Sequence, residues 1–208
     1  MKDKFLILDD VLSQTYLKYL IDYIFDVDWK FFSNLTYGNY LNDTDYEYGF
    51  TGKLSENQKH FFLPLIFEIC DRCNIKINDL NQISRIDPRL QTKLSSTCEV
   101  NDIHVDSDKG HYAIIFYPHD IDGETILYNE TTSNLSCHKL SQMSQEERAD
   151  LKKKFTILKK IEPKKNRAVI FNGNRFHSSS SPSKGPRCIV NINVLFDNDG
   201  TMCGFKYE

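Results

Sequence analysis

The triplet His104-Val105-Asp106 places two metal-binding side chains two residues apart. In an extended segment, residues i and i+2 point to the same side, so both side chains could face one ion. His177 follows a buried-strand pattern over 167–171 and an Asn-Gly-Asn turn, and it is a candidate third ligand. Two imidazoles and one carboxylate on one face leave coordination positions open, which suits the oxygen chemistry of Fe(II). His-x-Asp alone is a weak motif that arises by chance in a chain of this size, so its context decides.

The segment after His177 supplies that context. A predicted strand runs over 187–196, and its alternate residues form an apolar face: Cys188, Val190, Ile192, Val194 and Phe196. The opposite face carries Arg187, Asn191 and Asn193, together with Ile189 and Leu195. An arginine and two asparagines opposite a buried apolar face predict a polar pocket inside a barrel, although a solvated face would show the same pattern. The guanidinium of Arg187 is suited to hold a terminal carboxylate through paired hydrogen bonds.

Several further elements must position these residues. Apolar residues at helical spacing predict a helix over 10–26, and a second helix is expected over 55–73, capped by Ser55. Aromatic residues dominate 28–50, which we expect to be strand and loop that either packs against a sheet or closes over the substrate as a lid. Short strand-like runs follow at 82–87, 111–117, 124–129, 155–161, 167–171 and 187–196, interrupted by a predicted helix over 141–154. This order predicts an α+β protein with a β-sandwich or barrel core.

Composition narrows the class of protein. The 208 residues predict a single domain, 1–208, with a helical and aromatic part over about 1–80 and the strand-rich core over about 81–208. A net charge of −3 gives no electrostatic footprint for nucleic acid, and the basic run over 152–167 is expected to be a solvated face. No segment predicts a membrane span, and the apolar start is cut off by Asp9 and Asp10, unlike a signal peptide. We therefore expect a cytoplasmic protein without membrane partners.

The six cysteines are expected to be free, buried thiols. Cys70-x-x-Cys73 lacks the second pair that a zinc site needs, and its helical surroundings disfavour a redox pair.

Together these features resemble the prolyl 4-hydroxylase-like branch of the Fe(II)- and 2-oxoglutarate-dependent dioxygenases. The matching stretches, which span nearly the whole chain, are the lead-in 5–13, the metal motif His104-Val105-Asp106, the strand 113–117, the turn Asp122-Gly123-Glu124-Thr125, the run 163–171, and His177 with Arg187. The chain departs from the family at Pro118-His119, at Glu124 and in the helix over 141–154, which resembles an insertion. These departures affect loops, which set substrate choice.

The resemblance implies a double-stranded β-helix, or jelly roll, flanked by N-terminal helices. It implies that His104, Asp106 and His177 hold Fe(II), and that Arg187 and the Tyr117 hydroxyl hold the 2-oxoglutarate co-substrate. With O2, such an enzyme hydroxylates an unactivated C–H and releases succinate and CO2, and ascorbate is a candidate reductant. Asn191 and Asn193 are expected to line the pocket or support the ligands, and His111 and His119 to be loop or supporting residues.

The substrate implied first is a prolyl residue in a peptide or protein, with a free amino acid or small metabolite as the alternative. Two other functions compete. A zinc hydrolase could use the same His/Asp/His set, but it needs a carboxylate base and gives Arg187 no role. A non-catalytic jelly-roll binding module would not need an intact ligand set. The sequence leaves the oligomeric state open.

Overall fold

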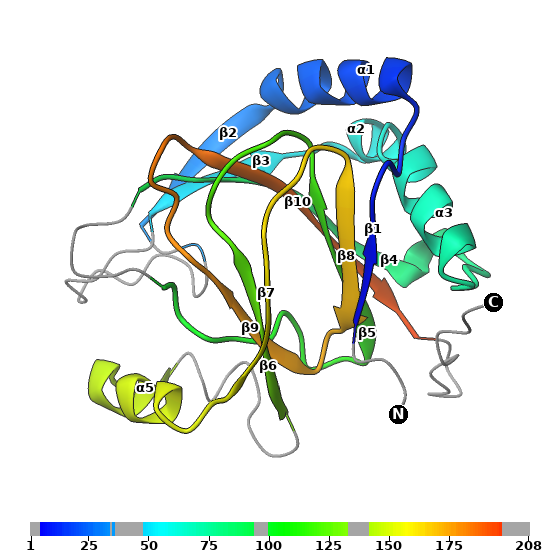
Figure 1. Ribbon diagram of the computed structural model, residues 1–208. Coiled ribbons are helices and arrows are strands. Elements are labelled where there is room, and N and C mark those ends of the chain that lie inside the picture. Colours follow the sequence, from blue (N-terminus) through cyan, green and yellow to red (C-terminus); the bar gives the residue numbers. More distant parts are fainter. Residues whose placement is uncertain (1–4, 34, 36–47, 94–99, 133–141, 197–208) are drawn as a thin grey trace.

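The computed structural model describes residues 5–33, 35, 48–93, 100–132 and 142–196. Two antiparallel sheets face each other (Figure 1). The larger sheet has the strand order β1-β8-β5-β10-β4-β3-β2, and the smaller has the order β7-β6-β9. The strands are β1 (Phe5–Leu8), β2 (Asp28–Phe32), β3 (Gly49–Lys53), β4 (Ile83–Gln91), β5 (His111–Tyr117), β6 (Thr125–Thr131), β7 (Ile157–Ile161), β8 (Arg167–Asn172), β9 (Arg175–Ser179) and β10 (Arg187–Leu195).

Helices cover the outer face of the larger sheet. They are α1 (Gln14–Phe25), α2 (Glu56–His60) and α3 (Leu63–Arg72), followed by a short 3-10 turn, η1 (Leu80–Gln82). One continuous apolar cluster joins buried residues of α1 and α3 to the outward-facing residues of the sheet, among them Cys188, Val190, Ile192 and Val194 of β10. The apolar face expected for this strand is therefore confirmed, and its opposite face is turned toward the smaller sheet. The arrangement is a double-stranded β-helix with N-terminal helices, as the resemblance implied.

The first predicted helix is confirmed as α1, with Ser13 as its N-cap, accepting from the Tyr16 amide. The predicted helix over 55–73 is instead two helices. The helical structure is interrupted at Phe61 and Phe62. Pro64 occupies the first turn of α3, where its missing N–H is tolerated.

All six predicted strand runs are present, but two strands were missed. The short stretch Phe5–Leu8 pairs with β8 along the edge of the larger sheet, and β9, for which no element was predicted, pairs with β6. Of the aromatic segment, 28–32 and 49–53 form β2 and β3. Residues 36–47, on which the lid hypothesis depends, lie outside the described residues.

The expected insertion helix forms as α5 (Gln145–Lys152), and Ser144 and Glu147 make its capping box. Leu151, with Met143 and Phe155, packs against a small apolar cluster that includes Ile103 and Val105. The Lys152 ammonium lies 2.8 Å from an Asp102 carboxylate oxygen. The insertion therefore braces the chain segment that carries His104 and Asp106.

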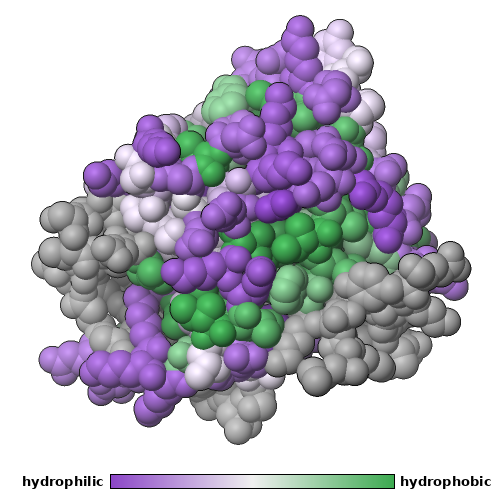
Figure 2. Space-filling model, in the orientation of Figure 1, coloured by the Kyte–Doolittle hydropathy of each residue, from purple (hydrophilic) through white to green (hydrophobic). Residues whose placement is uncertain are grey.

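The face seen in Figure 1 is largely hydrophilic, with a band of hydrophobic side chains across its middle (Figure 2). Isolated exposed apolar side chains, such as Tyr19 on α1 and Ile157 on β7, are ordinary on globular proteins. In the part of the chain that is described, no helix is long and apolar enough to cross a membrane.

Cys70, Cys73 and Cys188 are free and buried, while Cys98, Cys137 and Cys203 lie outside the described residues. Burial raises the pKa of Cys70 to about 12 and that of Cys73 to about 11. Because the thiolate is the reactive form, these values disfavour redox chemistry at the Cys70-x-x-Cys73 motif.

Candidate metal centre

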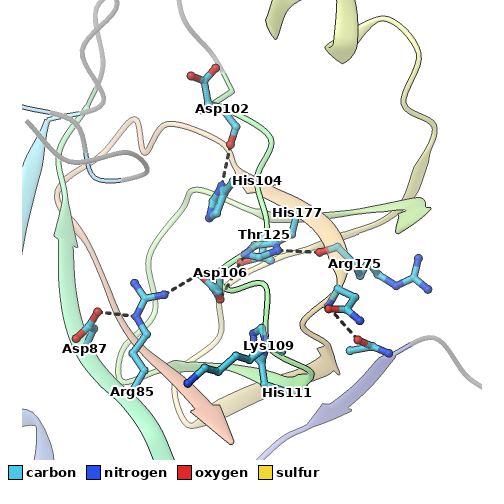
Figure 3. A network of polar contacts seen from close by, with 12 residues as sticks. Arg85, Asp87, Asp102, His104, Asp106, Lys109, His111, Thr125, Arg175 and His177 are labelled. Atoms are coloured by element: carbon cyan, nitrogen blue, oxygen red, sulfur yellow. Dashed lines mark hydrogen bonds and ion pairs between the residues drawn. The ribbon is translucent and has the colours of Figure 1, made fainter. Parts of the chain in front are cut away.

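The chain brings His104 and His177 together as neighbours across an isolated antiparallel bridge. Each backbone amide donates to the other residue's carbonyl oxygen at 3.0 Å, although His104 belongs to no regular strand. His177 lies in β9, which pairs with β6. Asp106 follows His104 on the same side, as the i and i+2 argument expected. One ligand atom from each of His104, Asp106 and His177 lies within 4.8 Å of the others (Figure 3).

Backbone carbonyls fix the orientation of both imidazole rings. Nδ1 of His104 lies 2.9 Å from the Asp102 carbonyl oxygen, and Nδ1 of His177 lies 3.1 Å from that of Arg175. A carbonyl oxygen can only accept, so each Nδ1 must donate and each Nε2 carries the lone pair. This second contact is the support that metal-binding histidines ordinarily have.

The electrostatics keep these groups in their ligating forms. Burial, followed by the nearby His177, lowers the pKa of His104 to about 3, and burial also lowers the pKa of His177. For Asp106, burial would raise the pKa, but neighbouring cations, first among them Arg85, hold it well below its ordinary value. Neutral imidazoles and an ionised carboxylate are the forms that bind a divalent ion.

A cavity lies beside this cluster, between the sheets. Its empty volume is about 480 Å³, part of it open to solvent. It is lined by Leu35, Arg89, Gln91, Asn101, His104, Ile115, Thr125, His177, Ser178, Ser179, Arg187, Ile189 and Asn191. His104 and His177, the two candidate histidine ligands, therefore border the same cavity as Arg187, the candidate partner of a 2-oxoglutarate carboxylate.

Arg187 is only 2% exposed, and no carboxylate among the described residues pairs with it. Its Nε donates to the Gly123 carbonyl oxygen at 2.7 Å, and its Nη2 donates to Thr125 Oγ1 at 2.8 Å. Burial lowers the pKa of Arg187, but an arginine keeps its charge. A buried cation with only neutral acceptors is costly unless an anion joins it.

Tyr117 is also buried, but its hydroxyl donates to Thr125 Oγ1 at 2.5 Å, and it does not line the cavity. Thr125 lines the cavity in its place. Because Thr125 Oγ1 accepts from both Tyr117 and Arg187, its own proton is free to be donated to a bound group. The structure thus places Tyr117 behind Thr125, and sequence reasoning did not single out Thr125 as a residue that lines the cavity.

The two asparagines of β10 are buried, as expected, and the Oδ1 atom of each has no hydrogen-bond partner. Asn191 lines the cavity, whereas Asn193 lies beside Arg85 of β4. His111 opens β5 and is buried against Gly173, outside the ligand cluster. His119 lies against Phe25, with ring centroids 6.0 Å apart.

Sequence reasoning also missed the polar row on β4. Arg85, Asp87, Arg89 and Gln91 alternate along the strand and pair with Asn193, Asn191, Ile189 and Arg187 of β10. Paired residues of neighbouring strands share a face, so this row faces the site. Arg85 contacts Asp106, and Arg89 and Gln91 line the cavity. The alternation of these polar residues with Ile86, Pro88 and Leu90 was the available signal, but Pro88, which cannot donate to a strand ladder, obscured it.

These residues fit an Fe(II) ion and 2-oxoglutarate. The two Nε2 lone pairs and the Asp106 carboxylate form the two-histidine, one-carboxylate donor set suited to non-haem Fe(II). The unpaired charge of Arg187 at the same cavity suits an anion with two carboxylates, one of which reaches the metal.

No model of a known protein family matches the chain, and no curated protein matches it. Solved structures do match. The non-haem α-ketoglutarate-dependent epimerase SnoN from nogalamycin biosynthesis has a TM-score of 0.62 at 9% identity, covering 100% of this chain and 88% of its own. HygX from Streptomyces hygroscopicus, with nickel, 2-oxoglutarate and hygromycin B bound, has a TM-score of 0.56 at 12% identity, covering 99% and 91%.

A third match is a prolyl hydroxylase from Trichoplax adhaerens, in complex with a peptide of the hypoxia-inducible factor oxygen degradation domain. Its TM-score is 0.55 at 13% identity, and the match covers 92% of this chain and 83% of that one. All three relatives have the same architecture. The chain therefore has the fold of the Fe(II)- and 2-oxoglutarate-dependent oxygenases, and the resemblance drawn from its sequence is confirmed at the level of the fold.

Proposed function

We propose that this protein is an Fe(II)- and 2-oxoglutarate-dependent dioxygenase that hydroxylates an unactivated C–H bond. The observation that carries the proposal is the meeting of two features at one cavity. The His104, Asp106 and His177 ligand atoms lie at one side, and the buried Arg187, without a carboxylate partner, lies at another. A zinc hydrolase or a binding module has no use for both features together.

The protein's part in this reaction is binding and orientation. His104, Asp106 and His177 would hold Fe(II), which supplies the oxidative chemistry when bound with 2-oxoglutarate and O2. Arg187 and the Thr125 hydroxyl would bind the far carboxylate of 2-oxoglutarate, with Tyr117 and the Gly123 carbonyl oxygen fixing both groups. Among the cavity-lining residues, Ile115 and Ile189 supply apolar walls for the methylene groups.

We infer a substrate bound through neutral polar groups, with a prolyl residue of a peptide or protein as the leading candidate. Asn101 Nδ2 donates to Ser179 Oγ, which donates to Gln91 Oε1, at 2.8 and 3.2 Å. This chain of bonds leaves the Gln91 Nε2 donor and the Asn101 Oδ1 acceptor buried without partners beside the cavity. A donor and an acceptor together match an amide group, which every peptide presents.

The cavity lining disfavours a free amino acid within the small-molecule alternative. No aspartate or glutamate is among the described residues that line the cavity, so an ammonium group would lack a counter-charge. A small metabolite remains the alternative to a peptide, since HygX is bound to hygromycin B and the Trichoplax adhaerens enzyme to a peptide.

The proposal is tested by turnover. Purified protein with Fe(II), ascorbate and air should convert 2-oxoglutarate to succinate slowly without substrate, and faster with a peptide library whose members gain the mass of one oxygen atom. The Asp106→Asn variant should do neither. Succinate formation that is unchanged in this variant, or absent from the wild type under all conditions, would rule out the proposed reaction.

A further inference from the structure

Arg85 joins two carboxylates, one of which is the candidate metal ligand. Its Nη1 lies 2.7 Å from Asp106 Oδ1, and its Nε lies 2.6 Å from Asp87 Oδ2 (Figure 3). The side chains of Asp106 and Arg85 are 6% and 18% exposed, so water screens this ion pair little. Arg85 and Asp87 are alternate residues of β4, and both side chains therefore project from the same face of the strand.

The ion pair with Arg85 gives the two carboxylate oxygens of Asp106 different partners. Oδ1 accepts from Arg85, whereas Oδ2 lies 3.7 Å from His177 Nε2. For both oxygens to bind one ion, Oδ1 would have to turn toward the ion and share its charge between the ion and the guanidinium. The contact between Arg85 and Asp106 would then be weakened in a buried setting, which is unfavourable.

We propose that Arg85 is a positioning residue that restricts Asp106 to ligation through one oxygen. The inference rests on the proposed function and deepens it. Two histidines and a one-oxygen carboxylate fill three of six positions around Fe(II). Two of the remaining positions serve the chelating end of 2-oxoglutarate, and the last serves O2. A carboxylate that bound through both oxygens would occupy a position that the reaction needs.

Asp87 supports the positioning role of Arg85 in two ways. Its hydrogen bond to Nε holds the guanidinium so that Nη1 keeps facing Asp106. Its charge also matters, because Asp106, Arg85 and Asp87 together carry a net charge of −1, whereas Asp106 and Arg85 alone would carry none. Asp87 thus offsets the positive charge that Arg85 brings against the candidate metal ligand.

The test measures how Asp106 binds a metal, independently of turnover. Infrared difference spectra of the full chain with and without Zn(II) report the carboxylate bands, and the bands lost in Asp106→Asn belong to that residue. The gap between the two carboxylate stretches is wide for one-oxygen binding and narrow for two-oxygen binding. We expect a wide gap in the wild type and a narrow gap in Arg85→Met. Calorimetry should show 2-oxoglutarate binding to the Zn(II) form weakened about tenfold, within the range for lost outer contacts of a metal site.

Arg167→Met is the matched control. Arg167 also pairs with an aspartate, donating to both carboxylate oxygens of Asp9 at 2.7 and 3.0 Å, but it lies outside the site. It should keep the wild-type bands and 2-oxoglutarate affinity. Arg85→Lys retains the charge and guards against a folding defect in Arg85→Met. One ammonium cannot reproduce both contacts, so this variant should show an intermediate gap.

The possible results distinguish a failure of the proposed metal site from a failure of the proposed role of Arg85. A wild-type spectrum without Asp106 bands on Zn(II) addition defeats the metal site itself, and the proposed function with it. A normal wild-type spectrum with the same wide gap in both Arg85 variants defeats only the positioning role and leaves Arg85 a structural residue. A narrowed gap in folded Arg85 variants, together with an unchanged Arg167→Met, establishes the role.

Discussion

Replacing Arg187 by methionine should weaken 2-oxoglutarate binding strongly while changing the stability of the ligand-free protein little. In the free protein the guanidinium donates to the Gly123 carbonyl oxygen and to Thr125 Oγ1, and no carboxylate among the described residues is its partner. Losing these two hydrogen bonds costs about 1–3 kcal/mol for each acceptor left buried. Removing a buried charge recovers about 1–4 kcal/mol. At the middle of these ranges, about 4 kcal/mol lost and about 2.5 kcal/mol recovered, the two effects offset each other to within about 2 kcal/mol.

The affinity for 2-oxoglutarate should change much more than the stability of the ligand-free protein. In Arg187→Met, the far carboxylate of bound 2-oxoglutarate would lose its cationic partner at position 187. Charge-assisted hydrogen bonds contribute about 3 kcal/mol at the upper end, which corresponds to a roughly 100-fold rise in Kd. Thermal unfolding of the Zn(II) form measures both effects. At about 100 times the wild-type Kd, 2-oxoglutarate should stabilise the wild type by about 2.7 kcal/mol and Arg187→Met by well under 1 kcal/mol. Equal stabilisation of the two proteins would refute this account of Arg187.

Three further predictions concern the framework of the site. Gly123→Ala should raise the Kd for 2-oxoglutarate about tenfold in calorimetry, because Gly123 has a φ of 96° and a Cβ would lie 2.8 Å from Arg187 Cδ. Gly173→Ala should lower the free energy of unfolding by about 1–3 kcal/mol in urea titrations, since a Cβ would lie 2.1 Å from the His111 ring; unchanged stability would contradict this close packing. The metal-free protein should lose stability as the pH falls from 6.5 toward 3, because burial holds the pKa of His104 at about 3 in the folded state while the unfolded chain takes up a proton near 6.5. A pH-independent melting temperature over this range would contradict it.

The sequence was sufficient for the parts of the site that depend on local periodicity. His104 and Asp106 share a side because they are two residues apart, and the alternation of β10 places Arg187 and Asn191 opposite the apolar face. These relations follow from strand geometry alone. The strand runs were found for the same reason. The break between α2 and α3 was missed although Pro64, which is tolerated in a first helical turn but not in a helix interior, marks the start of a new helix.

The parts that escaped prediction depend on contacts between distant segments. Arg85 meets Asp106 across 21 positions of the chain, and Tyr117 reaches Thr125 rather than the cavity. Neither partner can be chosen from spacing, because the register between strands decides which side chains are opposed. Ser179 is a further example. It is one of four consecutive serines after His177, and only the contacts show that it joins Gln91 and Asn101 at the cavity wall.

The central claim is that one cavity holds Fe(II) and 2-oxoglutarate together, and the visible spectrum of the anaerobic protein tests it most directly. Fe(II) and then 2-oxoglutarate are added to the wild type, to His177→Ala and to His119→Ala, a histidine outside the ligand cluster. We predict a weak metal-to-ligand charge-transfer band that needs both additions, persists in His119→Ala and disappears in His177→Ala. No band in the wild type, with tight Zn(II) binding instead, would contradict the dioxygenase assignment and favour a hydrolase or a binding module.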